Sequence, residues 1–303
     1  MSAPAGPWSG RLLHLIGVGG AGMSGYARAA HALGAQVSGS DAASGPYLES
    51  LAADGVLEAH VGHRAENLPP GEEVEVFYST AVGAENVERR AARARGLAER
   101  TRAELLAELS AMRRTIAVAG THGKTTTSSM LVNALRAAGM HPGWLVGAPI
   151  GGGLPNAEWG TGEWLVVEAD ESDRSMLSLS VEIAVLTNVE LDHHATFASL
   201  AELRDAFSEF LALATRAAVL WDRPELLELA AELDSVGVEL VRYDVPSPTL
   251  EPGGSRFRWR GREVRLGVPG AHNALDAAAA LEAARLAGAD GDAAISALER
   301  FRG

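Results

Sequence analysis

The 303-residue chain has no cysteine, which excludes disulfide bridges, thiolate metal sites and a cysteine nucleophile. It also has no run of about 18 apolar residues, so we expect no membrane-spanning helix. No charged start followed by an apolar stretch and a small-residue cleavage site is visible, which argues against a secretory signal. These absences together favour a protein of the reducing cytoplasm.

Basic residues are scarce compared with acidic ones. Lys and Arg total 26 and Asp and Glu total 39, which gives a net charge of −13 at pH 7. This balance argues against broad binding to the nucleic-acid backbone. It still allows a local site for an anionic nucleotide, because such sites use backbone N–H groups and one or two cations.

An alternation of short apolar runs and amphipathic runs occurs twice along the chain, which predicts two α/β domains with parallel sheets. In the first part we expect strands at Leu13–Val18, Gln36–Gly39 and Val74–Tyr78 and helices at Gly22–Leu33, Asn86–Arg95 and Arg102–Ser110. In the second we expect strands at Thr115–Ala119, Trp164–Val167, Ile183–Leu186, Ala217–Leu220 and Val238–Tyr243, helices at Lys124–Ala138 and Ala274–Ala287, and a hairpin at Phe257–Leu266. The second alternation of strands and helices begins after Met112, so the predicted domains are residues 1–112 and 113–303.

A first glycine loop joins the first strand to the first helix. Gly17, Gly19 and Gly22 fit G-x-G-x-x-G, in which glycines allow a tight turn and close approach of a phosphate to the helix N-terminus. Asp41 ends the second predicted strand, where a carboxylate can bind a ribose hydroxyl. From these residues alone, NAD binding, another nucleotide and a purely structural glycine turn all remain open.

A second glycine loop follows the strand Thr115–Ala119. The loop residues are Gly120, Thr121, His122, Gly123, Lys124, Thr125 and Thr126. The ending Gly-Lys-Thr is typical of phosphate loops: backbone N–H groups hold phosphate oxygens, Lys124 neutralises β- and γ-phosphate charge, and the Thr125 hydroxyl binds Mg²⁺. The general pattern has glycine where this chain has Val118. We therefore predict an ATP site.

Two strands of the second part end on polar side chains that can complete a magnesium site. Glu168 ends the first and is followed by Asp170, Glu171 and Asp173. His193 follows the second, after Asn188, and can ligate a metal or contact the γ-phosphate. The alternative for the stretch from Glu168 to Asp173 is a solvated acidic turn, and the alternative for His193 is a structural role.

These segments, taken together and in order, resemble the Mur ligases. The motifs that carry the resemblance are Gly17–Ser24, Ser38–Asp41, Tyr78–Val82, Gly120–Thr126, Glu168–Asp173, Thr187–His193 and Gly270–Leu275. They cover nearly the whole chain. The set is specific, although no single member is.

The resemblance implies that the first domain is a Rossmann-like domain for a UDP-sugar and the second a P-loop domain for ATP and Mg²⁺. The implied UDP-sugar residues are Gly17, Gly19, Gly20, Ala21, Gly22, Met23 and Ser24 at the diphosphate and Ser40, Asp41, Ser79 and Thr80 at the uridine and sugar. The implied catalytic residues are Lys124, Glu168 and His193, and Mg²⁺ would be held by Thr125, Glu168 and His193. His272 and Asn273 would lie beside the adenine and its ribose.

The implied reaction joins L-alanine to UDP-N-acetylmuramate. ATP would phosphorylate the lactyl carboxylate, and the amine of L-alanine would then displace phosphate from the acyl phosphate. Phosphoryl transfer mainly needs alignment and charge neutralisation, so no covalent nucleophile is required.

The chain departs from the family pattern at two places. Asp276 stands where the family usually has an asparagine. The family also has a C-terminal domain that closes over ATP, and the chain ends at Arg300-Phe301-Arg302-Gly303, which looks like the hinge to that domain. We therefore expect this domain to be absent and the chain alone to be inactive.

Three other functions remain open at this stage. A related ligase that attaches a recycled peptide to the same sugar nucleotide would look similar over these two domains. A module that binds both nucleotides without catalysis would fit the early end of the chain. An NAD-dependent oxidoreductase is disfavoured, because it would leave the phosphate loop without a role.

Overall fold

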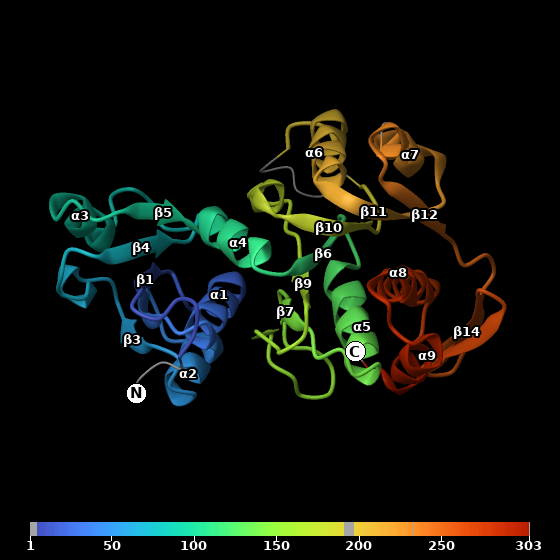
Figure 1. Ribbon diagram of the computed structural model, residues 1–303, viewed down its shortest axis with the longest axis horizontal. Helices are drawn as coiled ribbons and strands as arrows, with labels where there is room; N and C mark the ends of the chain where they lie inside the picture. Colours follow the sequence, from blue (N-terminus) through green and yellow to red (C-terminus); the bar gives the residue numbers. More distant parts are fainter. Residues whose placement is uncertain (1–4, 191–196, 232, 303) are drawn as a thin grey trace. The chain divides into compact units, whose positions relative to one another are not determined.

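A computed structural model of the chain describes residues 5–190, 197–231 and 233–302. The chain divides into two compact units. The first consists of Met1–Leu109 and the short segment Asn156–Trp159, and the second of Ser110–Pro155 and Gly160–Gly303. Both are α/β units built on parallel strands, coloured blue to cyan and green to red in Figure 1. Among the described residues no helix is long and apolar enough to cross a membrane.

The described strands of the first unit form a parallel sheet in the order β3-β2-β1-β4-β5. The strands are β1 (Leu12–Ile16), β2 (Gln36–Asp41), β3 (Glu58–Val61), β4 (Val74–Tyr78) and β5 (Glu99–Thr101). The helices are α1 (Ala21–Ala32), α2 (Pro46–Ala53), α3 (Val87–Ala94) and α4 (Arg102–Ala111). The strand order reverses between β1 and β4, and ligands of such sheets bind beyond the carboxyl ends of the strands at this point.

The second unit is built on a parallel sheet in the order β12-β11-β10-β6-β9-β7. Its strands are β6 (Arg114–Ala119), β7 (Gly143–Leu145), β9 (Trp164–Glu168), β10 (Val181–Leu186), β11 (Ala214–Trp221) and β12 (Glu239–Tyr243). The short β8 (Ala157–Glu158) lies in the segment that groups with the first unit. The central strands read as continuous apolar runs because both faces of the sheet are buried.

Helices cover both faces of this second sheet. They are α5 (Lys124–Ala137), α6 (Leu200–Ala212), α7 (Pro224–Leu227), α8 (Ala271–Ala287) and α9 (Gly291–Arg300). In Figure 1, α6 and α7 lie on one side of β10 and β11, and α5 and α8 lie on the other. The alanine-rich α8 packs closely on α5, which sets the start of α8 beside the start of α5.

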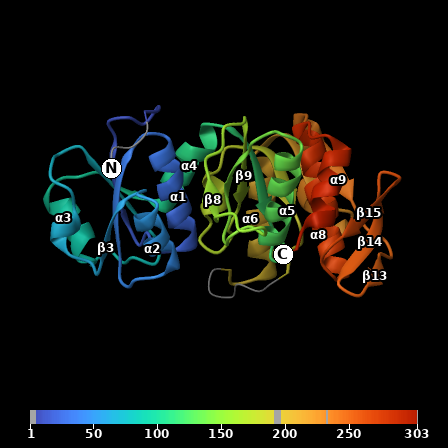
Figure 2. The ribbon, with the colours of Figure 1, turned by 90° about the horizontal axis from the view of Figure 1, so that it is seen from below.

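A small antiparallel sheet completes the second unit. It contains β13 (Thr249–Glu251), β14 (Gly254–Trp259) and β15 (Arg262–Leu266), and it lies beside α8 and α9 in Figure 2. The β14–β15 hairpin turns at Arg260 and Gly261, whose φ angles are +48° and +80°. Two successive positive φ values are the geometry of a tight two-residue hairpin turn, so the predicted hairpin is confirmed.

The α/β architecture with parallel sheets was predicted correctly, and each strand and helix expected from the sequence is present with small shifts at its ends. The elements that the sequence reading did not name are α2, α6, α7, β3, β5, β7, β8 and β13. Helix α6 was missed although Ser199 caps it by accepting a hydrogen bond from the Glu202 N–H at 3.2 Å. The predicted boundary at Met112 compares with a break between Leu109 and Ser110, and the return of Asn156–Trp159 to the first unit was not expected.

Candidate nucleotide-binding sites

The phosphate loop of the second unit needs glycine at two positions. Gly120 has φ of +132°, and a Cβ atom there would lie 2.0 Å from the Thr187 hydroxyl oxygen. Gly123 has φ of +81° and directly precedes α5, so the loop delivers the N-terminus of a helix. Free N–H groups at such a terminus attract anions. The loop therefore presents a helix N-terminus at the position where the sequence predicts phosphate binding.

The loop is fixed by the segment that follows β10. The Asn188 side chain bonds both backbone groups of His122, through Oδ1 to its N–H and through Nδ2 to its carbonyl, each at 2.9 Å. The Thr187 hydroxyl also donates to the His122 carbonyl at 2.7 Å. Thr121 donates its hydroxyl to the Glu190 carbonyl at 2.8 Å. Three residues that follow β10, Thr187, Asn188 and Glu190, therefore hold the loop backbone in place, while the His122 side chain stays exposed.

Lys124 is held by a buried acid. Its Nζ lies 2.9 Å from Oε2 and 3.0 Å from Oε1 of Glu171, and it donates to the Gly120 carbonyl at 2.7 Å. The side chain of Glu171 is 0% exposed and that of Lys124 13% exposed. The sequence reading placed Glu171 only in an acidic stretch. The structure makes it the direct partner of the predicted phosphate-binding lysine.

Thr125 and Glu168 come together at the carboxyl ends of β6 and β9. The Thr125 hydroxyl donates to Oε1 of Glu168 at 2.9 Å, and Oε2 of Glu168 accepts from the Gly147 N–H at 2.8 Å. Two hard oxygen atoms thus converge beside the phosphate loop, which fits the oxygen preference of Mg²⁺. His193, the third predicted ligand, lies outside the described residues. Within the described residues no cluster of three His, Asp or Glu side chains could hold a metal, so a cation here would take its other ligands from phosphate, water or residues beyond that part.

The predicted adenine residues lie at the start of α8. His272 is exposed, and the Asn273 side-chain amide donates to the Pro269 carbonyl at 2.6 Å. One turn further along, Asp276 lies against Gly123: a Cβ atom on Gly123 would come within 2.4 Å of Oδ1 of Asp276. This contact brings the first turn of α8 to the phosphate loop. Asp276, where the chain departs from the family pattern, therefore lies against the candidate phosphate loop.

The glycine loop of the first unit closes over the end of β2. The N–H groups of Gly17 and Val18 both donate to the Ser40 carbonyl, at 2.8 and 3.0 Å. Gly17 has φ of +83°, and a Cβ atom on it would meet the Ser79 Cβ atom at 2.9 Å. The Asp41 carboxylate accepts from the Gly19 N–H at 2.9 Å. Asp41 is thus already engaged by the loop, while its proposed contact with a ribose stays a prediction.

The remaining predicted residues of this loop differ in how much of them a ligand can reach. Met23 and Ser24 are 2% and 1% exposed, and the Ser24 hydroxyl donates to the Ala21 carbonyl at 2.8 Å. Gly20 and Thr80 are exposed, whereas Ala21, Gly22 and Ser79 are half-buried. Arg102, which the sequence reading did not select, lies beside the loop: a Cβ atom on Gly22 would be 3.3 Å from one of its guanidinium nitrogens. Arg102 is a cation at the predicted diphosphate position.

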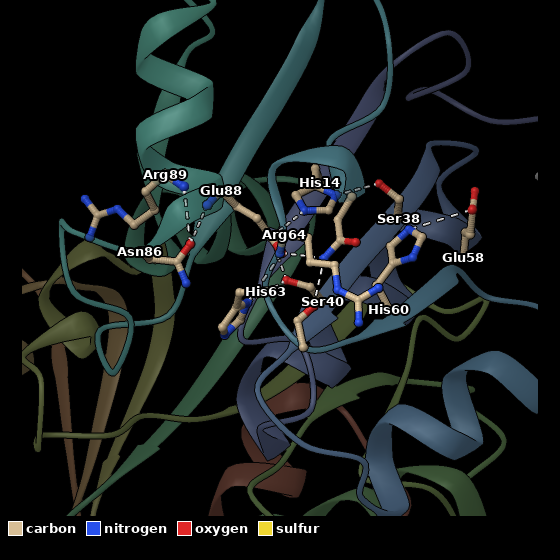
Figure 3. A network of polar contacts seen from close by, with 12 residues as sticks. His14, Ser38, Ser40, Glu58, His60, His63, Arg64, Asn86, Glu88 and Arg89 are labelled. Carbon is tan, nitrogen blue, oxygen red and sulfur yellow. Dashed lines mark hydrogen bonds and ion pairs between the residues drawn. The ribbon is translucent and has the colours of Figure 1, made fainter.

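A buried carboxylate organises the same end of this sheet (Figure 3). Glu88, in the first turn of α3, is 0% exposed, and its oxygens accept hydrogen bonds from His14 Nε2 (2.9 Å), Ser40 Oγ (2.6 Å), Arg64 N (3.0 Å) and Asn67 Nδ2 (2.6 Å). Burial by itself would raise the pKa of Glu88. The hydrogen bonds from His14, Ser40 and Asn67 outweigh burial and lower the pKa to about 2.

The network extends outward from Glu88 in two directions. His14 contacts the Ser38 hydroxyl through Nδ1 at 2.8 Å, and Ser40 contacts His63 Nδ1 at 3.0 Å. Because the Ser40 hydroxyl donates to Glu88, its oxygen accepts the proton on His63 Nδ1. Ser40 itself is 0% exposed, and the accessible end of the network is His63, whose side chain is 20% exposed. The sequence reading selected Ser40 and missed His14, His63 and Glu88, which lie far apart in the chain.

Comparison with known proteins identifies the family. Residues 12–114 match the domain described as Mur ligase family, catalytic domain, and residues 118–284 match the Mur ligase middle domain. The second match alone spans more than half of the chain. The chain belongs to the Mur ligase family.

Curated relatives of this Mur ligase chain carry one name. UDP-N-acetylmuramate–L-alanine ligase of Methylobacterium sp. (strain 4-46) is 40% identical over 316 residues, which covers 96% of this chain and 65% of that protein. The protein of the same name from Mycolicibacterium smegmatis is 38% identical over 314 residues, covering 96% of this chain and 64% of that protein. The chain thus spans about 65% of the length of the curated relatives it matches.

Solved structures of other Mur ligases have the same fold. A ligase from Neisseria meningitides, UDP-N-acetylmuramate:L-alanyl-gamma-D-glutamyl-meso-diaminopimelate ligase, superimposes with a TM-score of 0.85 at 26% identity over 97% of this chain and 98% of that chain. The UDP-N-acetylmuramate-alanine ligase of Thermotoga maritima gives a TM-score of 0.81 at 26% identity over 96% of this chain and 68% of that chain. Both ligases therefore share the fold over almost all of the present chain.

Proposed function

We propose that this Mur ligase chain belongs to an ATP-dependent ligase that joins L-alanine to UDP-N-acetylmuramate. The observation that carries the proposal is the convergence of Lys124, Thr125 and Glu168 on one phosphate loop at the carboxyl ends of β6 and β9. The name shared by relatives that are about 40% identical supports L-alanine as the second substrate.

In this proposal the second unit aligns ATP and neutralises its charge. N–H groups of the loop and of the first turn of α5 hold the phosphates, and Lys124 moves from Glu171 onto a phosphate oxygen. Thr125 and Glu168 hold Mg²⁺, which when bound offsets negative charge on the phosphates. The lactyl carboxylate attacks the γ-phosphorus with departure of ADP, and the alanine amine then attacks the acyl carbon with departure of phosphate. His272 and Asn273 bind the adenosine end.

The first unit would hold the UDP-sugar. Gly17, Gly19 and Gly22 let the diphosphate approach the start of α1, and Arg102 supplies a positive charge beside it. Ser79 and Thr80 lie after β4 and face the uridine and sugar. Ser40 contributes through His63, because its own hydroxyl is buried.

A peptide-attaching ligase is the second candidate, because the Neisseria ligase matches this fold with a TM-score of 0.85. The names of the curated relatives favour L-alanine over it. Either enzyme would work in the cytoplasm, where ATP and the sugar nucleotide are found, and we propose that location. Neither would bind nucleic acid.

Calorimetric titration of the two nucleotides tests the site assignments. Wild-type protein should bind UDP-N-acetylmuramate and ATP–Mg²⁺ independently, and Lys124→Ala should weaken ATP binding at least about tenfold while UDP-N-acetylmuramate binding is unchanged. Equal ATP affinity of the two proteins would contradict the role of the phosphate loop.

A further inference from the structure

Asp276 places an ionisable group against the phosphate loop. A Cβ atom on Gly123 would lie 2.4 Å from Oδ1, 3.0 Å from Cγ and 3.1 Å from Oδ2 of Asp276, so the whole carboxyl group contacts this residue. Gly123 immediately precedes α5, whose first residue is Lys124. The carboxyl group of Asp276 is therefore in contact with the backbone that we propose to bind phosphate.

The surroundings of Asp276 do not compensate a negative charge. The residue is 7% exposed, and Lys, Arg and His side chains make no ion pair with it in the part of the chain that the structure describes. From the phosphate loop it faces Gly123 and from the first turn of α5 it faces Thr127, and both are uncharged. From β12 it faces Tyr243, whose pKa is raised by burial and by the charge of Asp276, so the phenol stays neutral. On α8 itself the nearest titratable group is the exposed His272, one turn earlier.

Such an environment favours the protonated acid. Burial raises the pKa of Asp276 to about 7, and the Thr127 hydroxyl lowers it by a smaller amount. Below that pH the group is a neutral donor and acceptor, much like the asparagine that the family usually has there. Above it the group is an anion in low-dielectric surroundings, where repulsion of phosphate is strong.

We propose that the proton on Asp276 controls nucleotide affinity: the phosphate loop binds a nucleoside triphosphate well when this carboxyl is neutral and poorly when it is ionised. The inference rests on the proposed ATP site. The inference adds to this ATP site a residue, Asp276, that makes nucleotide affinity depend on pH. Nucleotide binding would then be accompanied by uptake of a proton on Asp276. An asparagine at the same position would give neither property.

The test is calorimetric titration of ATP–Mg²⁺ into wild-type and Asp276→Asn proteins between about pH 6 and about pH 8.5. Wild-type affinity should fall about tenfold over this range, which corresponds to a rise of about one pKa unit on binding. Asp276→Asn should bind with nearly constant affinity and exceed wild type about tenfold at the upper pH. Asp244→Asn is the matched control: it removes an exposed carboxylate next to Tyr243 and should keep the wild-type pH dependence. Equal pH dependence in wild type and Asp276→Asn overturns the inference.

A second measurement needs no nucleotide. The folded pKa of Asp276 is raised from 3.8 to about 7, so the unfolded chain loses this proton first as pH rises. Wild-type stability should therefore fall relative to Asp276→Asn between those two pH values, in thermal unfolding of both proteins. A difference in stability between the two proteins that does not change with pH overturns the inference. If neither protein binds ATP at any pH, the ATP site itself is wrong and the inference falls with it. Binding with equal pH dependence refutes only the role of Asp276.

Discussion

Lys124 Nζ lies 2.9 Å from Oε2 of Glu171, a carboxylate with 0% exposure. In a phosphate loop the lysine has to reach phosphate, yet here it already has an anionic partner. In the proposed function, nucleotide binding would exchange one anion for another at Nζ, and Lys124 would have to leave Glu171. Glu171 therefore holds Lys124 in the loop and would compete with the nucleotide for it.

Replacing Lys124 should cost stability as well as ATP affinity. Lys124→Ala removes the ammonium group that lies 2.9 Å from the buried Glu171 carboxylate. Breaking buried pairs costs about 3–5 kcal/mol, and the partial exposure of Lys124 places the expected loss near the lower figure. The double variant Lys124→Ala/Glu171→Gln should recover most of this stability and none of the ATP affinity. Chemical unfolding and ATP titration of both proteins measure this; an unchanged stability in Lys124→Ala would show that the pair is energetically neutral.

Glu171→Gln alone should strengthen ATP binding several-fold, because it removes the competitor for Lys124 and one negative charge near the phosphates. The neighbouring Asp173→Asn is a control for the general loss of a negative charge from the same acidic stretch. Titration of ATP–Mg²⁺ into both variants separates the removal of the competitor for Lys124 from the general loss of a negative charge. Weaker binding by Glu171→Gln would mean that Glu171 positions Lys124 for phosphate and does not compete with it.

The magnesium assignment predicts different losses with and without metal. Thr125→Ala and Glu168→Gln should weaken nucleotide binding at least about tenfold in Mg²⁺ and much less in EDTA, because each removes or weakens one oxygen ligand. Thr125→Ser keeps the hydroxyl and should bind as wild type does. Glu168→Gln retains an oxygen for the Gly147 N–H, which limits structural damage. Equal losses in both media would make the two residues structural.

Glu88 should stabilise the first unit in a pH-dependent way. Its pKa is about 2 in the folded protein against an ordinary 4.5, so its contribution is complete above pH 4.5 and is lost as pH falls toward 2. Glu88→Gln should destabilise the unit by about 2–3 kcal/mol at pH 7, because His14 and Ser40 lose an anionic acceptor. The difference from wild type should shrink in acid. Unfolding curves of both proteins across this range provide the test, and a difference that persists unchanged into acid would contradict the assignment.

The glycine loop of the first unit should bind UDP and discriminate against NAD. Gly19→Ala places a Cβ atom 2.9 Å from Oδ2 of Asp41, which breaks the contact that shapes the loop, and UDP affinity should fall at least about tenfold. Gly83→Ala, at a glycine with open space around it, is the matched control. Competition titrations with NAD should leave UDP binding unchanged. Displacement of UDP by NAD at comparable concentration would reassign this unit to a dinucleotide.

Much of the fold follows from local sequence signals. Continuous apolar runs such as Thr115–Ala119 predict buried parallel strands, and the glycine loops mark where helices α1 and α5 begin. Short edge strands such as β3, with four residues and little burial, carry too weak a pattern to predict. The segment Asn156–Trp159 joins the first unit through side-chain contacts such as Asn156 Nδ2 to the Ala21 carbonyl at 2.8 Å, and no local pattern encodes these.

In the candidate sites too, local sequence predicts some residues and does not reveal others. Lys124, Thr125 and Glu168 could be selected because each stands at a loop or strand end that parallel topology brings to one edge. The partners that tune them come from distant positions: Glu171 on Lys124, Asp276 on Gly123, and His63 on Ser40. Pairings of this kind are fixed by packing, so the sequence alone does not reveal them. The predicted ligand His193 stays a prediction.

The most direct test of the proposed reaction is an amide-forming assay that follows ADP release and product mass. It uses UDP-N-acetylmuramate, ATP–Mg²⁺ and either L-alanine or the tripeptide L-alanyl-γ-D-glutamyl-meso-diaminopimelate. The assay should be run on the 303-residue chain and on the chain extended through its reading frame to the length of its relatives. We predict that the extended protein releases ADP and forms the amide only when L-alanine and the sugar nucleotide are both present. Amide formation with the tripeptide and none with L-alanine would contradict the account.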